Sequence, residues 1–335
     1  MTTANGTHWA GRPVLVTGAG GFIGSHLVEA LVARGARVRA LLRYTSRGDR
    51  GALDLVDAET RDAVDLMFGD LTRADVVRAA FDGVTDAFHL GALIAIPYSY
   101  LSPDETVAVN VTGTLNVLQA ARHAGVRRLV HTSTSEVYGT ARQVPMDESH
   151  PLQGQSPYSA SKIGADKLAE AFSRSFDLPV VTVRPVNTFG PRQSTRAVIP
   201  TIITQLLDGP RVRLGRLTPR RDYTFVTDTV AGFLRAAEKA DLSWQEINLG
   251  TGRDVSVGEL LEIVARHLGV TPEVSTEAER VRPSNSEVDR LCSSNRRAAE
   301  VLGWSPSVSL DEGLRRTIDW IREHRDFYRT EAYHR

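Results

Sequence analysis

The chain has 335 residues, of which 41% are hydrophobic, and this length predicts about two domains with a sizeable core. Its 40 basic and 40 acidic side chains cancel, which argues against nucleic acid or a membrane as a partner. The lack of a signal peptide and of an apolar run of about 18 residues predicts a cytoplasmic protein. Cys292 is the only cysteine, so an intrachain disulfide is excluded and no metal site is predicted.

The first half of the chain alternates short β-branched runs with longer helical periods. Strands are predicted at residues 14–17, 38–42, 87–90, 129–133 and 180–184, and helices at residues 23–34, 73–81, 107–124 and 158–176. Strands that alternate with helices form parallel sheets through right-handed crossovers. The pattern therefore predicts an α/β fold, with a Rossmann-type doubly wound parallel sheet over residues 12–190.

After Pro185 the pattern changes to loops rich in Pro and Arg. These are followed by predicted helices at residues 198–207, 229–240, 257–268 and 311–325. A smaller C-terminal α/β lobe is therefore predicted over residues 191–224 and 251–330. Residues 248–250 resemble one more strand that returns to the sheet, so residues 225–250 are assigned to the first domain.

The run TGAGGFIG at residues 17–24 directly follows the first predicted strand and opens the first predicted helix. Glycines here let the backbone turn tightly and approach a pyrophosphate, which then lies at the helix N-terminus. A glycine-rich turn without a ligand is the alternative, but the strand-to-helix context favours a dinucleotide. The common spacing would place the last glycine at position 23. The predicted contacts are Gly18, Gly21, Phe22, Ile23 and Gly24.

The ribose of such a cofactor is predicted to lie at the end of the second strand. An acidic residue there binds a 2′-hydroxyl, whereas an Arg receives a 2′-phosphate. Residues 42–47 read LRYTSR and contain no acid, so Arg43 favours NADP over NAD, unless it and Arg47 are only solvated surface charges. Asp70 follows a third strand that ends at Gly69, and it either contacts the adenine or caps the next helix.

Tyr158 and Lys162 lie one helical turn apart in the run PYSASK at residues 157–162. A positive charge at this spacing favours the phenolate and lowers the pKa of the phenol towards neutrality, so the pair can remove a proton from an alcohol. Thr134, Ser135 and Glu136 precede the pair in the sequence. Each of these alone is typical of a strand end, a helix cap or a surface carboxylate. With Tyr158 following them, they predict a catalytic cluster.

Together these motifs resemble the extended short-chain dehydrogenase/reductase family that modifies nucleotide-activated sugars, over nearly the whole chain. Further matching runs are NVTGT at 110–114, HTSTSEVYG at 131–139, RPVNTFGPR at 184–192 and RDYTFVTD at 221–228. The resemblance implies a tightly bound nicotinamide cofactor in the large lobe and a nucleoside diphosphate sugar between the lobes. It also implies a homodimer through two helices of the large lobe, and cofactor contacts at Leu71, Leu90 and Ala92.

Glu136 occupies the position of a carboxylate in the family's 4,6-dehydratases, and the order Thr-Ser-Glu resembles GDP-mannose 4,6-dehydratases. The runs GALIAIPYSY at residues 91–100 and RAVIPT at 196–201 resemble the dehydratases of legionaminic acid pathways. Those enzymes act on a nucleotide-linked N-acetylglucosamine. The resemblance therefore favours a nucleotide-sugar 4,6-dehydratase.

The catalytic cluster can be assigned to the steps of such a dehydration. Tyr158 takes the O4 proton, Lys162 lowers its pKa and holds the ribose, and Thr134 hydrogen-bonds O4. Glu136 then removes the C5 proton. Ser135, or a water that it orders, helps the C6 hydroxyl leave.

The diphosphate of the substrate is an anion, and bidentate Arg side chains suit it. Arg221 and Arg282 match family positions that bind the diphosphate, and Asn187 matches one that contacts it or the sugar. Arg192 and Tyr98 are further candidates. Arg221 could instead belong to a surface ion-pair cluster, and Asn187 to a turn.

Two other hypotheses remain open for the same residues. An NDP-sugar 4-epimerase or an NDP-glucuronate decarboxylase shares this scaffold, and family epimerases need only the Tyr, the Lys and a Ser or Thr. The non-enzymatic hypothesis is a regulator that senses a dinucleotide without turnover. The intact Tyr158 and Lys162 count against it.

Overall fold

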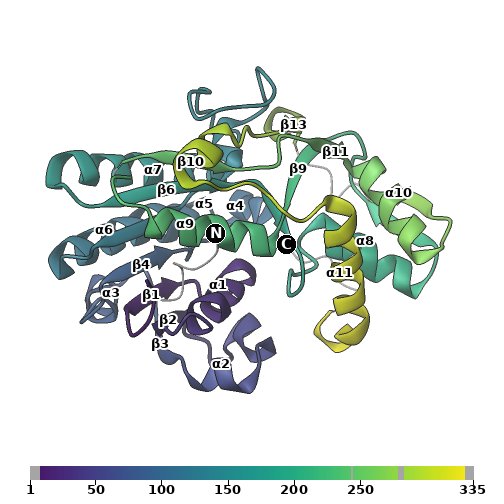
Figure 1. Ribbon diagram of the computed structural model, residues 1–335. Coiled ribbons are helices and arrows are strands. Elements are labelled where there is room, and N and C mark those ends of the chain that lie inside the picture. Colours follow the sequence, from purple (N-terminus) through teal and green to yellow (C-terminus); the bar gives the residue numbers. More distant parts are fainter. Residues whose placement is uncertain (1–7, 243, 278–282, 329–335) are drawn as a thin grey trace.

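The computed structural model describes residues 8–242, 244–277 and 283–328. Its centre is a seven-stranded sheet in the order β10-β6-β5-β4-β1-β2-β3, and all of its strand pairings are parallel (Figure 1). The strands are β1 Pro13–Thr17, β2 Arg37–Arg43, β3 Asp65–Gly69, β4 Asp86–His89, β5 Arg128–Thr132, β6 Val180–Pro185 and β10 Glu246–Leu249. The order confirms the predicted doubly wound sheet, and it places the carboxyl ends of all these strands on one edge.

Helices cover both faces of this sheet. Those on one face are α1 Phe22–Val32 and α9 Val226–Glu238, and those on the other are α3 Ala74–Ala80, α6 Gly113–Ala124 and α7 Pro157–Phe176. Val14 and Val16 of β1 are buried against the first set, whereas Leu15 is buried against the second. This alternation follows from the two-residue period of a strand, and burial on both faces explains why the strands are apolar almost throughout.

The smaller lobe, on the right in Figure 1, shares a hydrophobic core with the first face of the sheet. Its elements are β7 Asn187–Phe189, α8 Val198–Asp208, β8 Arg211–Leu214, β9 Arg220–Phe225, β11 Asp254–Ser256, α10 Val257–Leu268, β12 Glu273–Thr276, β13 Arg290–Leu291 and α11 Leu310–Glu323. The rings of Phe189 and Phe225 meet edge to face, with centroids 5.5 Å apart. Helix α11 approaches them through Gly313, where a Cβ would lie 2.6 Å from Cζ of Phe189.

The structure differs from the predicted elements mainly in short segments. The predicted helix at residues 107–124 consists of α5 Pro103–Val107, a π-helical turn η2 Ala108–Thr112, and α6. The remaining short elements are η1 Gly51–Leu55, α2 Ala58–Asp62, α4 Ile96–Leu101, η3 Ser135–Tyr138, η5 Ser284–Ser286, η6 Ala298–Leu302 and η7 Arg325–Phe327. Pieces this short carry too little periodicity to be predicted. Strand β10 pairs with β6, so the chain returns to the large sheet. The exact domain boundaries stay a prediction.

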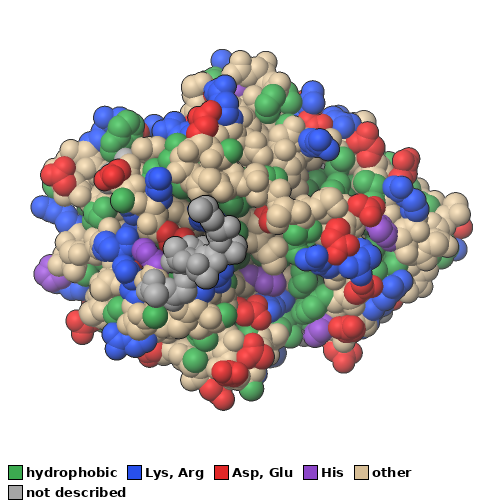
Figure 2. Space-filling model, viewed as in Figure 1, with side chains coloured by type: hydrophobic (Ala, Val, Ile, Leu, Met, Phe, Trp, Pro, Cys, Tyr) green, Lys and Arg blue, Asp and Glu red, His purple; other side chains and the backbone are tan. Residues whose placement is uncertain are grey.

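Basic and acidic side chains are intermixed over the face shown in Figure 2, in keeping with the formal net charge of zero. Among the helices that the structure describes, none is long and apolar enough to cross a membrane. The cytoplasmic location and the homodimer stay predictions.

Candidate active site

A cavity of about 1090 Å³ lies at the carboxyl edge of the large sheet and extends to the smaller lobe. Its walls come from the turn after β1, the ends of β2 to β5, the start of α7, and strands β7 and β9. The structure brings most of the predicted site residues to this cavity: Gly18, Gly21, Phe22, Ile23, Gly24, Arg43, Asp70, Leu71, Leu90, Ala92, Thr134, Glu136, Tyr158, Asn187 and Arg221.

The glycine-rich turn forms part of the cavity wall without side chains. Gly18 has a φ of +69°, and a Cβ there would lie 2.7 Å from the backbone nitrogen of Gly91. Helix α1 begins at Phe22, and Gly21 before it provides no side-chain cap. The backbone at this helix N-terminus is therefore open to the cavity, which is the arrangement that suits a pyrophosphate.

Arg43, at the end of β2, lines the cavity with a side chain that is 70% exposed. Its guanidinium lies 3.5 Å from the carboxylate of Glu105 on α5. The Ala52 N–H donates to the Gly20 carbonyl at 2.8 Å, which brings Arg50 to the same wall. No sequence signal marks Glu105 or Arg50, because the fold of a loop and the position of a helix place them here.

Asp70 caps the turn that follows β3. Its Oδ1 accepts hydrogen bonds from the backbone N–H and the hydroxyl of Thr72, both at 2.8 Å. The bond from the Thr72 N–H is the main cause that holds the pKa of Asp70 below its usual value. The carboxylate also lines the cavity. It is therefore a local cap in this structure, while the adenine contact stays a prediction.

Thr134, Glu136 and Tyr158 line the same cavity, on adjacent elements. Thr134 follows β5 and caps the 3₁₀ helix η3, since its Oγ1 accepts from the Glu136 N–H at 3.2 Å. Tyr158 lies in the first turn of α7, where Ser156 and Ser159 form a capping box. The end of a strand and the start of a helix thus supply two hydroxyls and a carboxylate to one site.

Burial raises the pKa of Tyr158 because it disfavours the phenolate. The hydrogen bond with the Thr134 hydroxyl acts in the opposite direction, and the charge of Glu136 raises the pKa further. The expectation that Lys162 lowers this pKa towards neutrality is not met in this geometry. Lys162 Nζ instead donates to the Thr132 carbonyl oxygen at 2.6 Å.

Ser135 and Tyr98 are predicted site residues that do not line the cavity. Ser135 is 2% exposed and lies between two residues that do line it. Tyr98 donates its hydroxyl to Glu105, and Tyr100 lines the cavity in its place. The spacing of residues in the sequence does not show which side chains of such irregular segments point inward.

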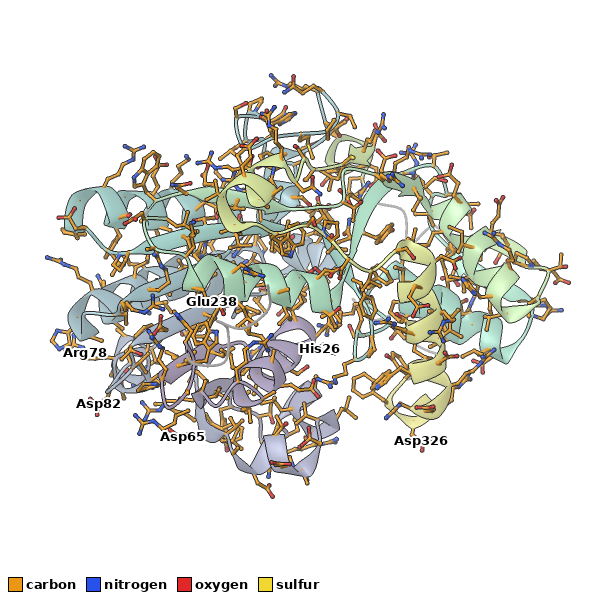
Figure 3. The ribbon with its side chains drawn as sticks, in the orientation of Figure 1. His26, Asp65, Arg78, Asp82, Glu238 and Asp326 are labelled. Carbon is orange, nitrogen blue, oxygen red and sulfur yellow. The ribbon has the colours of Figure 1, made fainter. Side chains whose placement is uncertain are left out.

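Arg192 also lies outside the cavity lining. It is buried and donates to Glu29 of α1 at 2.8 Å, so it joins the loop after β7 to that helix. His26, labelled on α1 in Figure 3, makes a second link there through Nε2, 3.0 Å from the Pro191 carbonyl oxygen. Burial lowers the pKa of His26 to about 4. These contacts correct the prediction of Arg192 as a phosphate ligand, and Arg282 lies outside the described residues.

Several polar groups on the cavity wall are open to a ligand. Asn187 Nδ2, Thr132 Oγ1 and Gln193 Oε1 are buried atoms without a hydrogen-bond partner among the residues that the structure describes. Arg221 is buried, and its Nη2 lies 3.7 Å from the Glu287 carboxylate. Buried polar atoms in native proteins are normally hydrogen-bonded, so this wall suits a polar ligand. Thr132 and Gln193 carry no motif in the sequence that would single them out.

The family model described as GDP-mannose 4,6 dehydratase matches residues 15–317. The chain is 36% identical over 314 residues to a UDP-glucose 4-epimerase of Mycolicibacterium smegmatis, with 92% of this chain and 98% of that protein covered. It is 35% identical over 324 residues to a dTDP-glucose 4,6-dehydratase of Streptomyces griseus, with 94% and 95% covered.

A solved structure with a similar fold is that of DesIV, a dTDP-glucose 4,6-dehydratase from Streptomyces venezuelae with NAD and TYD bound. The TM-score is 0.84 at 33% sequence identity, and the similarity covers 94% of this chain and 98% of that chain. Both dehydratases and an epimerase are thus similar to this chain over nearly its full length.

The charge state of Lys162 can be measured directly, because the chain has only three lysines and the other two, Lys167 and Lys239, are exposed. Burial lowers the pKa of Lys162 to about 8. In protein labelled with ¹³C-lysine, the resonance that is lost in the Lys162→Met variant is therefore expected to titrate with a midpoint near 8. A Lys162 resonance that does not change between about pH 7 and 9 would contradict this environment.

Proposed function

Because the chain belongs to the GDP-mannose 4,6-dehydratase family of the extended short-chain dehydrogenase/reductases, we propose that it is a nucleotide-sugar 4,6-dehydratase. It would convert an NDP-hexose into the 4-keto-6-deoxy sugar. The observation that carries the proposal is that Glu136 lines the same cavity as Thr134 and Tyr158. Oxidation of an alcohol needs a base at the oxygen, whereas dehydration also needs a base for the neighbouring C–H group.

The first step is oxidation at C4 of the sugar. A bound nicotinamide would supply the acceptor for the C4 hydride and return a hydride at the end of the cycle. Tyr158 takes the proton from O4, and the Thr134 hydroxyl, which hydrogen-bonds Tyr158, helps to hold O4. Lys162, one helical turn from Tyr158, provides a positive charge that stabilises the phenolate as the proton moves.

The second step is elimination of water across C5 and C6. Once C4 is a ketone, the C5 hydrogen is acidic and Glu136 removes it as a proton. The structure gives Ser135 no place in the cavity lining, so we assign the departure of water to Glu136 as well. The C5–H and C6–O bonds break, a C5–C6 double bond forms, and the proton held by Glu136 leaves with the C6 hydroxyl as water.

The substrate is held from the smaller lobe. Arg221 offers its guanidinium to the diphosphate, and the unpaired Asn187 Nδ2 offers a donor to the diphosphate or the sugar. We favour an N-acetylhexosamine as the sugar, because residues 91–100 and 196–201 resemble the legionaminic-type dehydratases and both runs contribute to the cavity wall.

We further propose NADP or NAD as the cofactor, with NADP favoured. The turn of Gly18 and Gly21, with no side chain in the way, suits the pyrophosphate. Arg43 and Arg50 place positive charge on the wall at the end of β2, which suits a 2′-phosphate. The relative DesIV was solved with NAD, and the Glu105 carboxylate beside Arg43 is suited to a 2′-hydroxyl, so both cofactors remain candidates.

A 4-epimerase is the second candidate function. The relative from Mycolicibacterium smegmatis is a UDP-glucose 4-epimerase, and Tyr158 with Thr134 suffices for oxidation and reduction at C4. The two candidates differ in whether Glu136 takes part in the reaction.

Incubation with UDP-, GDP-, CDP- and dTDP-hexoses in heavy water separates the two functions. A dehydratase product is expected to have lost water and to carry deuterium at C5. Glu136→Gln keeps the side-chain size but removes the base, so it is expected to lower the rate of this product roughly a hundredfold to ten-thousandfold. The matched control Ser135→Ala is expected to keep the wild-type rate. A product of unchanged mass, formed at the same rate by Glu136→Gln, would instead show an epimerase.

The preference for NADP depends on Arg43. Loss of a hydrogen bond to a charged group costs about 1.5–3 kcal/mol, so Arg43→Ala is expected to weaken NADP binding roughly tenfold to a hundredfold. NAD binding, measured by calorimetry on the same variant, is expected to change little. Arg47→Ala is the matched control, since Arg47 is exposed and outside the cavity lining. Equal losses for NADP and NAD would contradict the assignment of Arg43 to the 2′-phosphate.

A further inference from the structure

A buried polar network lies next to the proposed catalytic cluster and centres on Asp166 of α7. Asp166 is 1% exposed. Its carboxylate accepts hydrogen bonds from Ser133 Oγ at 2.7 Å, His131 Nε2 at 3.1 Å and Arg184 Nη2 at 3.0 Å. Asp166, His131 and Arg184 are absent from the cavity lining, so they are placed to act on the site only through other residues.

Asp166 and Lys162 hold the same short piece of β5. Lys162 lies one turn before Asp166 on α7 and donates to the carbonyl of Thr132. The residues on both sides of Thr132, namely His131 and Ser133, are hydrogen-bonded to Asp166. Helix α7 therefore grips three consecutive residues at the end of the strand, immediately before Thr134.

We propose that Asp166 is a positioning residue, whose buried carboxylate keeps Lys162 positively charged and fixes the end of β5 against α7. This arrangement holds Thr134 beside Tyr158. The consequence for turnover rests on the proposed function, whereas the effect on Lys162 does not.

The other charges around Lys162 do not replace Asp166. The titratable groups on the elements packed here are His89 on β4, His131 on β5, Glu136 on η3, Arg184 on β6, and Tyr158 with Asp166 on α7. Burial lowers the pKa of both histidines, so they are neutral at physiological pH. Arg184 is a cation paired with Asp166 and Glu246. Burial lowers the Lys162 pKa, and the charge of Asp166 opposes that effect.

The test is a pH titration of the Lys162 resonance in ¹³C-lysine-labelled Asp166→Asn. The amide keeps the shape and part of the hydrogen bonding of the carboxylate but removes its charge. The Lys162 midpoint is expected to fall by about one pH unit. Glu246→Gln is the matched control, because it removes the other carboxylate of Arg184, at 2.7 Å, without touching β5 or α7. The midpoint in this control is expected to stay at its wild-type value.

A second variant covers the case in which Asp166→Asn does not fold. Asp166→Asn combined with Arg184→Met removes the buried pair together, which proteins tolerate better than a broken pair. The Lys162 midpoint is expected to fall in this variant as well. A midpoint equal to that of the wild type in either folded variant would overturn the proposal.

A rate measurement adds a second readout. With an accepted nucleotide sugar, the alkaline limb of the pH–rate profile is expected to move to lower pH in Asp166→Asn and to stay in place in Glu246→Gln. A purely structural role would lower the rate equally at all pH values. If no nucleotide sugar is turned over, the proposed function fails, and the Lys162 titration still decides the role of Asp166.

Discussion

The hydrogen bond from Lys162 Nζ to the carbonyl of Thr132 joins the two elements on which the site depends. At 2.6 Å it fixes the first turns of α7 against the end of β5, and β5 lies between β4 and β6 inside the sheet. Tyr158 comes one turn before Lys162, and Thr134 comes two residues after Thr132. One contact therefore sets the place of both hydroxyls, and Glu136 follows from the short 3₁₀ helix that Thr134 caps. The parallel order of the strands brings the glycine-rich turn to the same edge.

This joint requires a cation to be buried, and a buried charge is unfavourable unless it is compensated. The compensation comes from a network that is itself charged. Burial opposes the ionisation of Asp166, but the hydrogen bond from His131 and the charge of Arg184 hold its pKa at about 2. Asp166 is therefore an anion throughout the physiological range. Hydrophobic packing at this position would remove the desolvation cost, but it would leave Lys162 without a counter-charge. The network is thus better explained by the proposed chemistry than by stability.

The sequence was sufficient to predict the sheet, the glycine-rich turn and the family, because long helices alternate with apolar strands and because an i, i+4 pair such as Tyr158 and Lys162 has a fixed geometry on a helix. It was insufficient wherever irregular backbone decides the direction of a side chain. Ser135 turns away from the cavity although both of its neighbours line it, and Arg192 is held by α1. Arg50 reaches the cavity through the fold of a loop. The strands of the smaller lobe are too short for a period of two to be visible.

One measurement decides whether this cavity carries out dehydration. An accepted nucleotide sugar is prepared with deuterium at C4, and the position of the label in the product is determined by NMR and mass spectrometry. If Tyr158, Thr134 and Glu136 act in the order described, the product has lost water and the deuterium is found in the C6 methyl group. A product that keeps all its atoms and carries the deuterium at C4 would contradict dehydration and leave C4 epimerisation as the function of this site.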